Sequence, residues 1–192
     1  PVDFLNIEIC LIKTNKSHAL DIIQTRKKAI LVPDKTPPVP SLFVHEVFHI
    51  LSRNYDFTSL YSLLGFNPCE NQTINDPNFL LNPDCVLVNQ SISLNINGEN
   101  KVVVPYLSQK EFVKLKEVGK ENYYKLSETN YSSLIKNTNY LVHPEEICAE
   151  LFALSLTNSC IYKGELDNSK LQEFNNQLKY LIVKNKLLKD SV

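Results

Sequence analysis

Two early segments of the chain have the hydrophobic patterns of β-strands, the first by alternation and the second as an apolar run. Residues 6–12 read Asn-Ile-Glu-Ile-Cys-Leu-Ile, and residues 28–32 form an apolar, β-branched run that Pro33 closes. A period of two is typical of a β-strand, and an apolar, β-branched run bounded by a turn residue also favours one. We therefore predict two strands at the start of the chain, followed by a proline-rich connector.

Helical spacing begins after this connector. Ser41 can cap a helix that runs to about Arg53, with apolar side chains at positions 43, 44, 47, 48 and 51 on its buried side. A second, short helix is expected to end at Leu64, because Gly65 follows it and glycine commonly ends helices.

Residues 85–96 and 101–106 are separated by the pair Asn97-Gly98. An Asn-Gly pair between two strand-like runs is a strong signal for a tight turn. We predict a β-hairpin here, within an insertion at about 66–107.

Three further helices are predicted in the second half of the chain. The run 108–111 (Ser-Gln-Lys-Glu) has the form of a capping box, Pro144 suits the first position of a helix, and apolar residues recur at helical spacing over 167–188. The predicted order is strands, a helix, a hairpin and then helices, so we expect an α+β fold. A chain of 192 residues fits a single domain, 1–192.

The charge balance excludes some partners. The chain has 20 basic and 21 acidic residues, a net charge of −1. Without a broad cationic field, nucleic acid and anionic membranes are disfavoured as partners. No apolar run approaches the ~20 residues that cross a bilayer, so we expect a soluble protein. The five cysteines show no C-x-x-C spacing, which favours a reducing, cytoplasmic-type environment.

The segment His45-Glu46-Val47-Phe48-His49 is an H-E-x-x-H motif inside the first predicted helix. Histidines at i and i+4 lie on one helix face, so both imidazoles can reach one Zn²⁺ ion. Glu46 then lies beside the open coordination position, where it can take a proton from water. Chance occurrence with exposed side chains is the alternative, and the rarity of histidine in this chain disfavours it.

A later segment supplies candidate carboxylates. Residues 146–150 read Glu-Ile-Cys-Ala-Glu, with Glu146 and Glu150 one helical turn apart. Carboxylates at this spacing repel each other unless cationic groups lie between them. Zinc and an imidazole would meet that need, with Glu146 as the third ligand and Glu150 accepting the free N–H of His45 or His49. A solvated acidic face is the alternative, and Glu145 would be the ligand if the helix were turned by about 100°.

These two motifs resemble those of the gluzincin metallopeptidases. The form E-x-x-A-E-x-F at 146–152 is similar to the second zinc helix of the lethal-factor type, and His45 to Arg53 resembles the H-E-x-F-H-x-x-S-R core of small bacterial effector metalloproteases. The resemblance implies a zincin-like fold, with one catalytic Zn²⁺ held by His45, His49 and Glu146.

The resemblance also implies roles for other residues. Glu46 would be the general base, and a Tyr or His would stabilise the oxyanion. Tyr140 and His143 are the two candidates, with a plain core tyrosine as the third reading. From arginine chemistry and not from the resemblance, we expect Arg53 either to brace the site or to anchor a substrate carboxylate or backbone.

We therefore expect a monomeric zinc endopeptidase with a protein or peptide substrate. The strand at 28–32 would be the edge strand on which an extended peptide adds. The resemblance also implies a bacterial effector or toxin protease that is secreted into a host cell and acts on a cytosolic protein. The alternative function is a zincin-like binding module with a structural metal.

Overall fold

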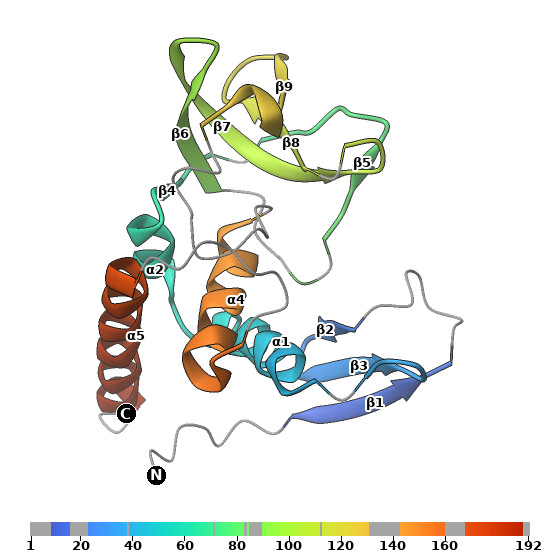
Figure 1. Ribbon diagram of the computed structural model, residues 1–192, viewed down its shortest axis with the longest axis vertical. Coiled ribbons are helices and arrows are strands. Elements are labelled where there is room, and N and C mark those ends of the chain that lie inside the picture. Colours follow the sequence, from blue (N-terminus) through green and yellow to red (C-terminus); the bar gives the residue numbers. More distant parts are fainter. Residues whose placement is uncertain are drawn as a thin grey trace.

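The computed structural model describes residues 9–15, 23–37, 39–70, 72–82, 84, 90–111, 113–130, 143–159 and 168–189. These ranges form two β-sheets and four α-helices, which confirms the predicted α+β class. In Figure 1 the two sheets lie toward opposite ends of the molecule, and helices α1 and α4 lie between them. Among the described residues, no helix combines the length and the apolarity needed to cross a membrane.

The first sheet has three strands in the order β1-β3-β2. β1 (Cys10–Thr14) pairs in parallel with β3 (Ala29–Pro33), and β2 (Gln24–Arg26) pairs antiparallel with the other side of β3. The two predicted strands therefore form, as β1 and β3, but the prediction that the 28–32 strand is an edge strand is wrong. β2 is too short to show a pattern, and it turns back through Lys27 at a φ of 55°, so it takes the edge position itself.

Helix α1 (Pro40–Ser52) begins two residues earlier than a Ser41 cap predicts, because Val39 is the N-cap residue and Ser41 lies inside the first turn. It packs against β2 and β3 on one side and against α4 on the other. Its buried Ile50 shares a small apolar cluster with Ile30 of β3 and with Ile23, the residue before β2. The helix that carries the H-E-x-x-H motif is thus fixed from both sides.

Helix α2 (Thr58–Leu63) ends before Gly65, as predicted, and Gly65 has a φ of +87°. L-residues with a side chain rarely adopt this conformation, so glycine suits the position. The chain then enters the second sheet.

The second sheet has six strands. They are β4 (Phe66–Pro68), β5 (Phe79–Leu80), β6 (Gln90–Ile96), β7 (Glu99–Ser108), β8 (Val113–Glu117) and β9 (Tyr123–Lys125), and a short 3₁₀ helix, η1 (Leu126–Glu128), follows. β6 and β7 form the predicted hairpin, with positive φ at Asn97 and Gly98. The first residues predicted for this hairpin, 85–89, lie outside the described residues. The sheet extends past the predicted insertion end at 107.

The helix predicted from Ser108 is wrong. Residues 113–117 form β8, which pairs antiparallel with β7 in a register that places Leu115 opposite Pro105. Val113 and Leu115 are buried two residues apart, so the strand period explains the burial better than the helical one. The apparent capping residue Ser108 ends β7, and its hydroxyl accepts a long hydrogen bond from the Lys110 N–H.

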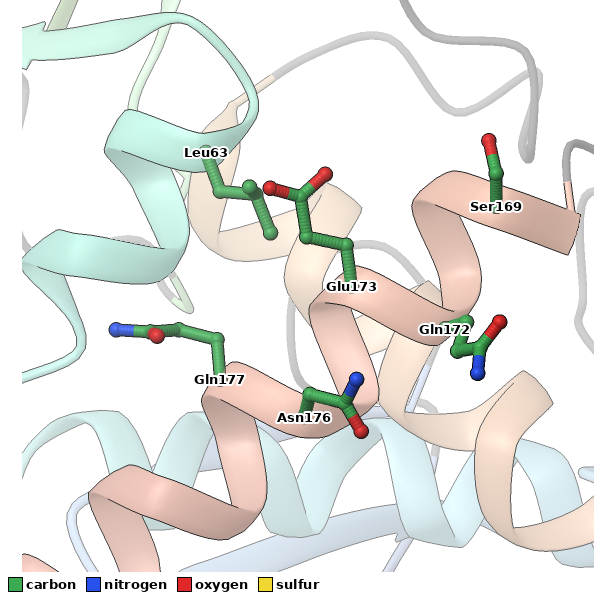
Figure 2. Close-up of a pocket in the computed structure, with 6 residues that line it drawn as sticks. All are labelled: Leu63, Ser169, Gln172, Glu173, Asn176 and Gln177. Carbon is green, nitrogen blue, oxygen red and sulfur yellow. The ribbon is translucent and has the colours of Figure 1, made fainter.

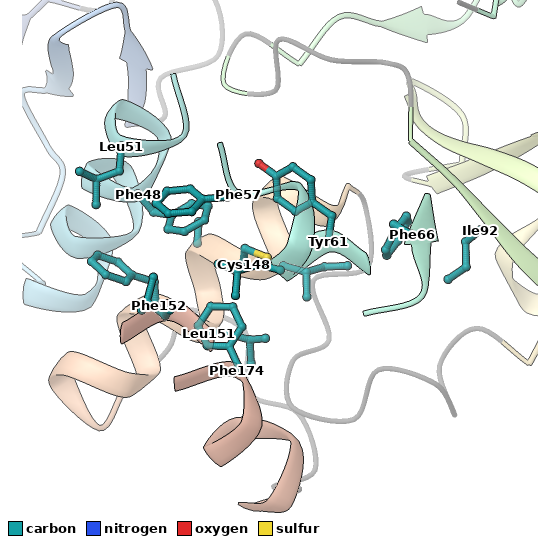
Figure 3. Close-up of a cluster of buried hydrophobic side chains, with 14 of the residues drawn as sticks. Phe48, Leu51, Phe57, Tyr61, Phe66, Ile92, Cys148, Leu151, Phe152 and Phe174 are labelled. Atoms are coloured by element: carbon teal, nitrogen blue, oxygen red, sulfur yellow. The ribbon is translucent and has the colours of Figure 1, made fainter. Parts of the chain in front are cut away.

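Helix α4 (Pro144–Thr157) begins at the proline that the sequence indicates, and α5 (Asn168–Lys189) covers most of the last predicted helix. A shared aromatic cluster holds α1 against α4. Phe48 of α1 stacks on Phe57 with ring centroids 5.2 Å apart and lies 5.6 Å from Phe152 of α4. Figure 3 shows these rings together with Leu151 and Phe174 of the same core. This packing brings the two predicted zinc segments together.

Candidate metal centre

Helices α1 and α4 place two imidazoles and one carboxylate around a common point. The His45 Nε2 atom lies 3.0 Å from Glu146 Oε2 and 3.2 Å from His49 Nε2. The third distance, from His49 Nε2 to Glu146 Oε2, is 3.6 Å. His45, His49 and Glu146 therefore form a group that can hold a metal ion.

The dimensions of this triangle fit zinc. Ligand atoms at the usual ~2.0–2.1 Å from Zn²⁺ lie about 3.3–3.4 Å apart in a tetrahedral site. Two of the observed distances, 3.0 and 3.2 Å, are slightly shorter than this value, and the third, 3.6 Å, is slightly longer. If these three groups bound zinc, a fourth coordination position would stay open, as it does in catalytic zinc sites.

Two more carboxylates contact the opposite nitrogens of the histidines. Glu150 Oε1 lies 2.9 Å from His45 Nδ1, and Glu145 Oε1 lies 3.1 Å from His49 Nδ1. Such partners fix the orientation of a ligand imidazole and raise its basicity. The contact of Glu150 is the one expected from its spacing. Glu145 lies beside His49 and outside the metal-binding group, in an orienting position that sequence reasoning missed.

The protonation of the metal-free site follows from this ring of carboxylates. Burial lowers the pKa of His45, but hydrogen bonds to Glu146 and Glu150 outweigh burial and raise it to about 9. Burial also lowers the pKa of His49. The nearby carboxylates of Glu146 and Glu145 outweigh burial and raise this pKa well above its ordinary value. The pKa of Glu146 is held well below its ordinary value despite burial, because both imidazoles face it.

Glu46 lies beside this group on the same helix, and only 3% of it is exposed. The Thr25 hydroxyl of β2 donates to its Oε2 at 2.6 Å and also lies 3.1 Å from its backbone oxygen. Thr25 thus fixes the carboxylate of the expected general base. No signal in the sequence points to Thr25, because the contact joins two segments that only the fold brings together.

A short segment of the insertion covers the group. Asn82 Nδ2 donates to Glu146 Oε1 at 2.7 Å, and Asp84 Oδ1 accepts the Thr25 backbone N–H at 2.6 Å. Burial, followed by the nearby charge of Glu46, raises the pKa of Asp84 to about 7. Sequence reasoning placed these residues within the insertion at about 66–107 and gave them no role.

Arg53 follows α1 and contacts backbone oxygens. Its guanidinium donates to the carbonyls of Asp84 at 3.1 Å, Lys27 at 3.3 Å and Thr25 at 3.5 Å. These contacts agree with a bracing role, since they tie the covering segment to β2.

The two candidates for an oxyanion donor differ in what the structure describes. Tyr140 lies outside the described residues. His143 is the N-cap of α4, and its Nδ1 accepts the Glu145 backbone N–H at 3.2 Å. This bond satisfies an N–H at the start of the helix that carries Glu146, which gives His143 a structural part.

A surface hollow of about 430 Å³ lies between α2 and α5, away from the metal-binding group (Figure 2). Its lining is polar apart from one leucine and holds no histidine or cysteine: Leu63, Ser169, Gln172, Glu173, Asn176 and Gln177. Among the described residues, the group that could hold a metal lies instead at the α1–α4 interface.

No protein-family model, no curated protein and no solved structure matches this chain. The function of the chain must therefore be inferred from the site itself.

Proposed function

We propose that this chain is a zinc-dependent endopeptidase. The observation that carries the proposal is the triangle of His45 Nε2, His49 Nε2 and Glu146 Oε2, with the carboxylate of Glu46 on the same helix as the two histidines. Two histidines, one glutamate and a second, non-ligand glutamate are the residues that zinc hydrolysis of amides needs.

Zinc bound by this group would polarise the scissile carbonyl and make water a stronger nucleophile at neutral pH. Glu46 would accept the proton of the water whose oxygen attacks the carbonyl carbon. The same carboxyl group would return that proton to the leaving nitrogen as the C–N bond breaks, which yields a carboxylate and an amine. The hydrogen bond from Thr25 supports this role, because it holds the Glu46 side chain in one rotamer.

The alternative is a binding module with a structural metal. Burial of the site favours it, since His45 is 5% exposed and Glu146 is 3% exposed. A module that does not catalyse has no chemical need for Glu46, and this favours the peptidase. The expected bacterial effector role, and a host protein as substrate, stay predictions.

Substitution of Glu46 separates the two functions. Glu46→Gln keeps the size of the side chain and removes the proton acceptor, so zinc content should stay at one ion per chain. Cleavage of casein or of a peptide library should fall by about 10²–10⁴-fold, the usual contribution of a positioned general base. His45→Ala should lose both zinc and cleavage. Zinc-loaded wild type that cleaves no peptide bond, or a Glu46→Gln variant with unchanged turnover, would refute the peptidase.

A further inference from the structure

In the edge strand β2, the backbone N–H and carbonyl of Thr25 point away from β3. The backbone N–H of Thr25 donates to Asp84, and the backbone carbonyl of Thr25 accepts a hydrogen bond from Arg53. Both backbone groups therefore face away from β3. A peptide that extends a sheet must bond to outward groups of this kind. Thr25 also holds Glu46, so these groups lie beside the expected catalytic carboxylate.

In this structure the chain itself occupies that edge. The Asp84 carboxylate takes the Thr25 N–H at 2.6 Å, the bond that a substrate carbonyl would otherwise accept. Arg53 bridges the carbonyls of Thr25 and Asp84 and holds the two segments together. Both hydrogen-bonding groups of Thr25 are therefore taken by groups outside the sheet.

The same segment reaches the metal-binding group. Asn82 donates to Glu146 Oε1, the oxygen that faces away from the two histidines, at 2.7 Å. Its own Oδ1 accepts the Asp84 N–H at 3.0 Å, so Asn82 and Asp84 support each other. Together they contribute to the burial of a site that a substrate must reach.

The hydrogen bond between the Asp84 carboxylate and the Thr25 N–H has an electrostatic cost. Asp84 is 7% exposed and lies within the field of Glu46 and Glu146, and burial with these charges raises its pKa. A buried carboxylate beside others is stabilised less well than in water. A peptide carbonyl carries no net charge, so it can accept the Thr25 N–H without this electrostatic cost. An extended peptide can therefore displace the Asp84 carboxylate from the Thr25 N–H.

We propose that Asn82 and Asp84 form an internal cap on the substrate edge of β2, and that an extended peptide displaces this cap before it is cleaved. The inference rests on the proposed function, and it names the regulation of that site. Substrate binding then includes the release of the Asp84 carboxylate from the Thr25 N–H.

Three variants test the cap. Asp84→Ala removes the acceptor, Asp84→Asn keeps an acceptor without the charge, and Asp34→Ala is a matched control at an aspartate that pairs with the exposed Lys13. Amide hydrogen exchange over β2 is measured by mass spectrometry on zinc-free protein. Cleavage of fluorescein-labelled casein is measured on zinc-loaded protein.

Asp84→Ala should speed exchange at β2 by roughly 10-fold and should raise kcat/KM on casein by a similar factor through a lower KM, since a bond to a charged group is lost. Asp84→Asn should keep the slow exchange, with turnover no higher than that of wild type. Asp34→Ala should change neither quantity. General loss of stability cannot mimic this pattern, because it would lower turnover as exchange rises.

Unchanged exchange in Asp84→Ala, or a fall in turnover with zinc retained, would overturn the cap. If exchange rises but neither wild type nor any variant cleaves casein, the peptidase is overturned, and the substrate role of β2 falls with it. The exchange measurement does not depend on activity, so the two failures are distinguishable.

Discussion

Glu145 and His49 are held together across the α1–α4 interface, with Glu145 Oε1 3.1 Å from His49 Nδ1. The Ser52 hydroxyl, one turn further along α1, donates to the same carboxylate oxygen. His49 is fully buried, so this carboxylate sets the orientation of the ring that directs Nε2 toward Glu146. The residue next to the expected ligand Glu146 therefore contacts a candidate ligand, His49, and lies outside the group that could hold a metal.

This relationship predicts different effects for two adjacent glutamates. Glu146→Ala removes a ligand and should abolish zinc binding at micromolar concentrations. Glu145→Ala should weaken zinc binding by about 10–100-fold without abolishing it, the usual effect of losing an orienting partner. Zinc affinity is measured by competition with a chromophoric chelator. Glu99→Ala at an exposed site is the control, and equal losses for Glu145 and Glu146 would contradict the assignment.

Zinc binding should release protons. His45 has a pKa of about 9 in the metal-free site, whereas a zinc ligand must be neutral. Zinc affinity should therefore rise with pH up to about 9. Calorimetry at pH 7 in buffers of different ionisation enthalpy should detect the release of at least one proton, and an enthalpy independent of the buffer would refute this.

The same shift predicts how pH affects the metal-free fold. The folded-state pKa of His45 lies above its ordinary value of 6.5, so the folded form binds the proton more tightly than the unfolded form. This contribution to stability is complete below pH 6.5 and is lost as the pH rises through about 9. The melting temperature of EDTA-treated protein should therefore fall over this window, and His45→Gln should flatten that slope.

Thr25 should matter for catalysis and not for metal binding. Thr25→Val keeps the β-branched shape but removes the hydroxyl that bonds to Glu46, so the carboxylate loses its fixed position. We expect zinc content to be unchanged and kcat on casein to fall by roughly 10-fold. Thr25→Ser restores the hydroxyl and should recover most of the activity. A purely structural role would instead lower the melting temperature of both variants and leave kcat unaltered.

Phe48 should contribute strongly to the free energy of unfolding, because its side chain packs α1 against α4. Its ring is fully buried between Phe57 and Phe152, so Phe48→Ala should reduce the free energy of unfolding by about 3–5 kcal/mol. Leu156 is 63% exposed on α4, and Leu156→Ala should change that free energy by less than about 0.5 kcal/mol. Urea denaturation of zinc-free protein measures both values.

Local signals in the sequence account for several elements. The spacing of His45 and His49 places both on one face of a helix, because four residues make about one turn. Pro144 and the pair Asn97-Gly98 mark the start of α4 and the turn of the hairpin in the structure. Each of these signals depends on backbone geometry within a few residues, so each can be read without the fold.

The same local reasoning fails where long-range pairing decides. The run from Ser108 has the form of a capping box, yet pairing with β7 makes residues 113–117 a strand. The strand at 28–32 was predicted at an edge, but β2 pairs with its free side. In both cases a neighbouring strand supplies hydrogen bonds and buried contacts that outweigh local propensity.

The sequence alone therefore identifies His45 and His49 as candidate metal ligands, because ligand type and helical spacing are local properties. It leaves open whether Glu145 or Glu146 joins them. Only the tertiary structure decides that Glu146 meets them. His45 and Glu146 are 101 residues apart in the chain, and packing of the aromatic core brings their side-chain atoms to 3.0 Å. The contact of Asp84 with Thr25, across 59 residues, has no local signal at all, because it depends on how the insertion folds back over the edge of the first sheet.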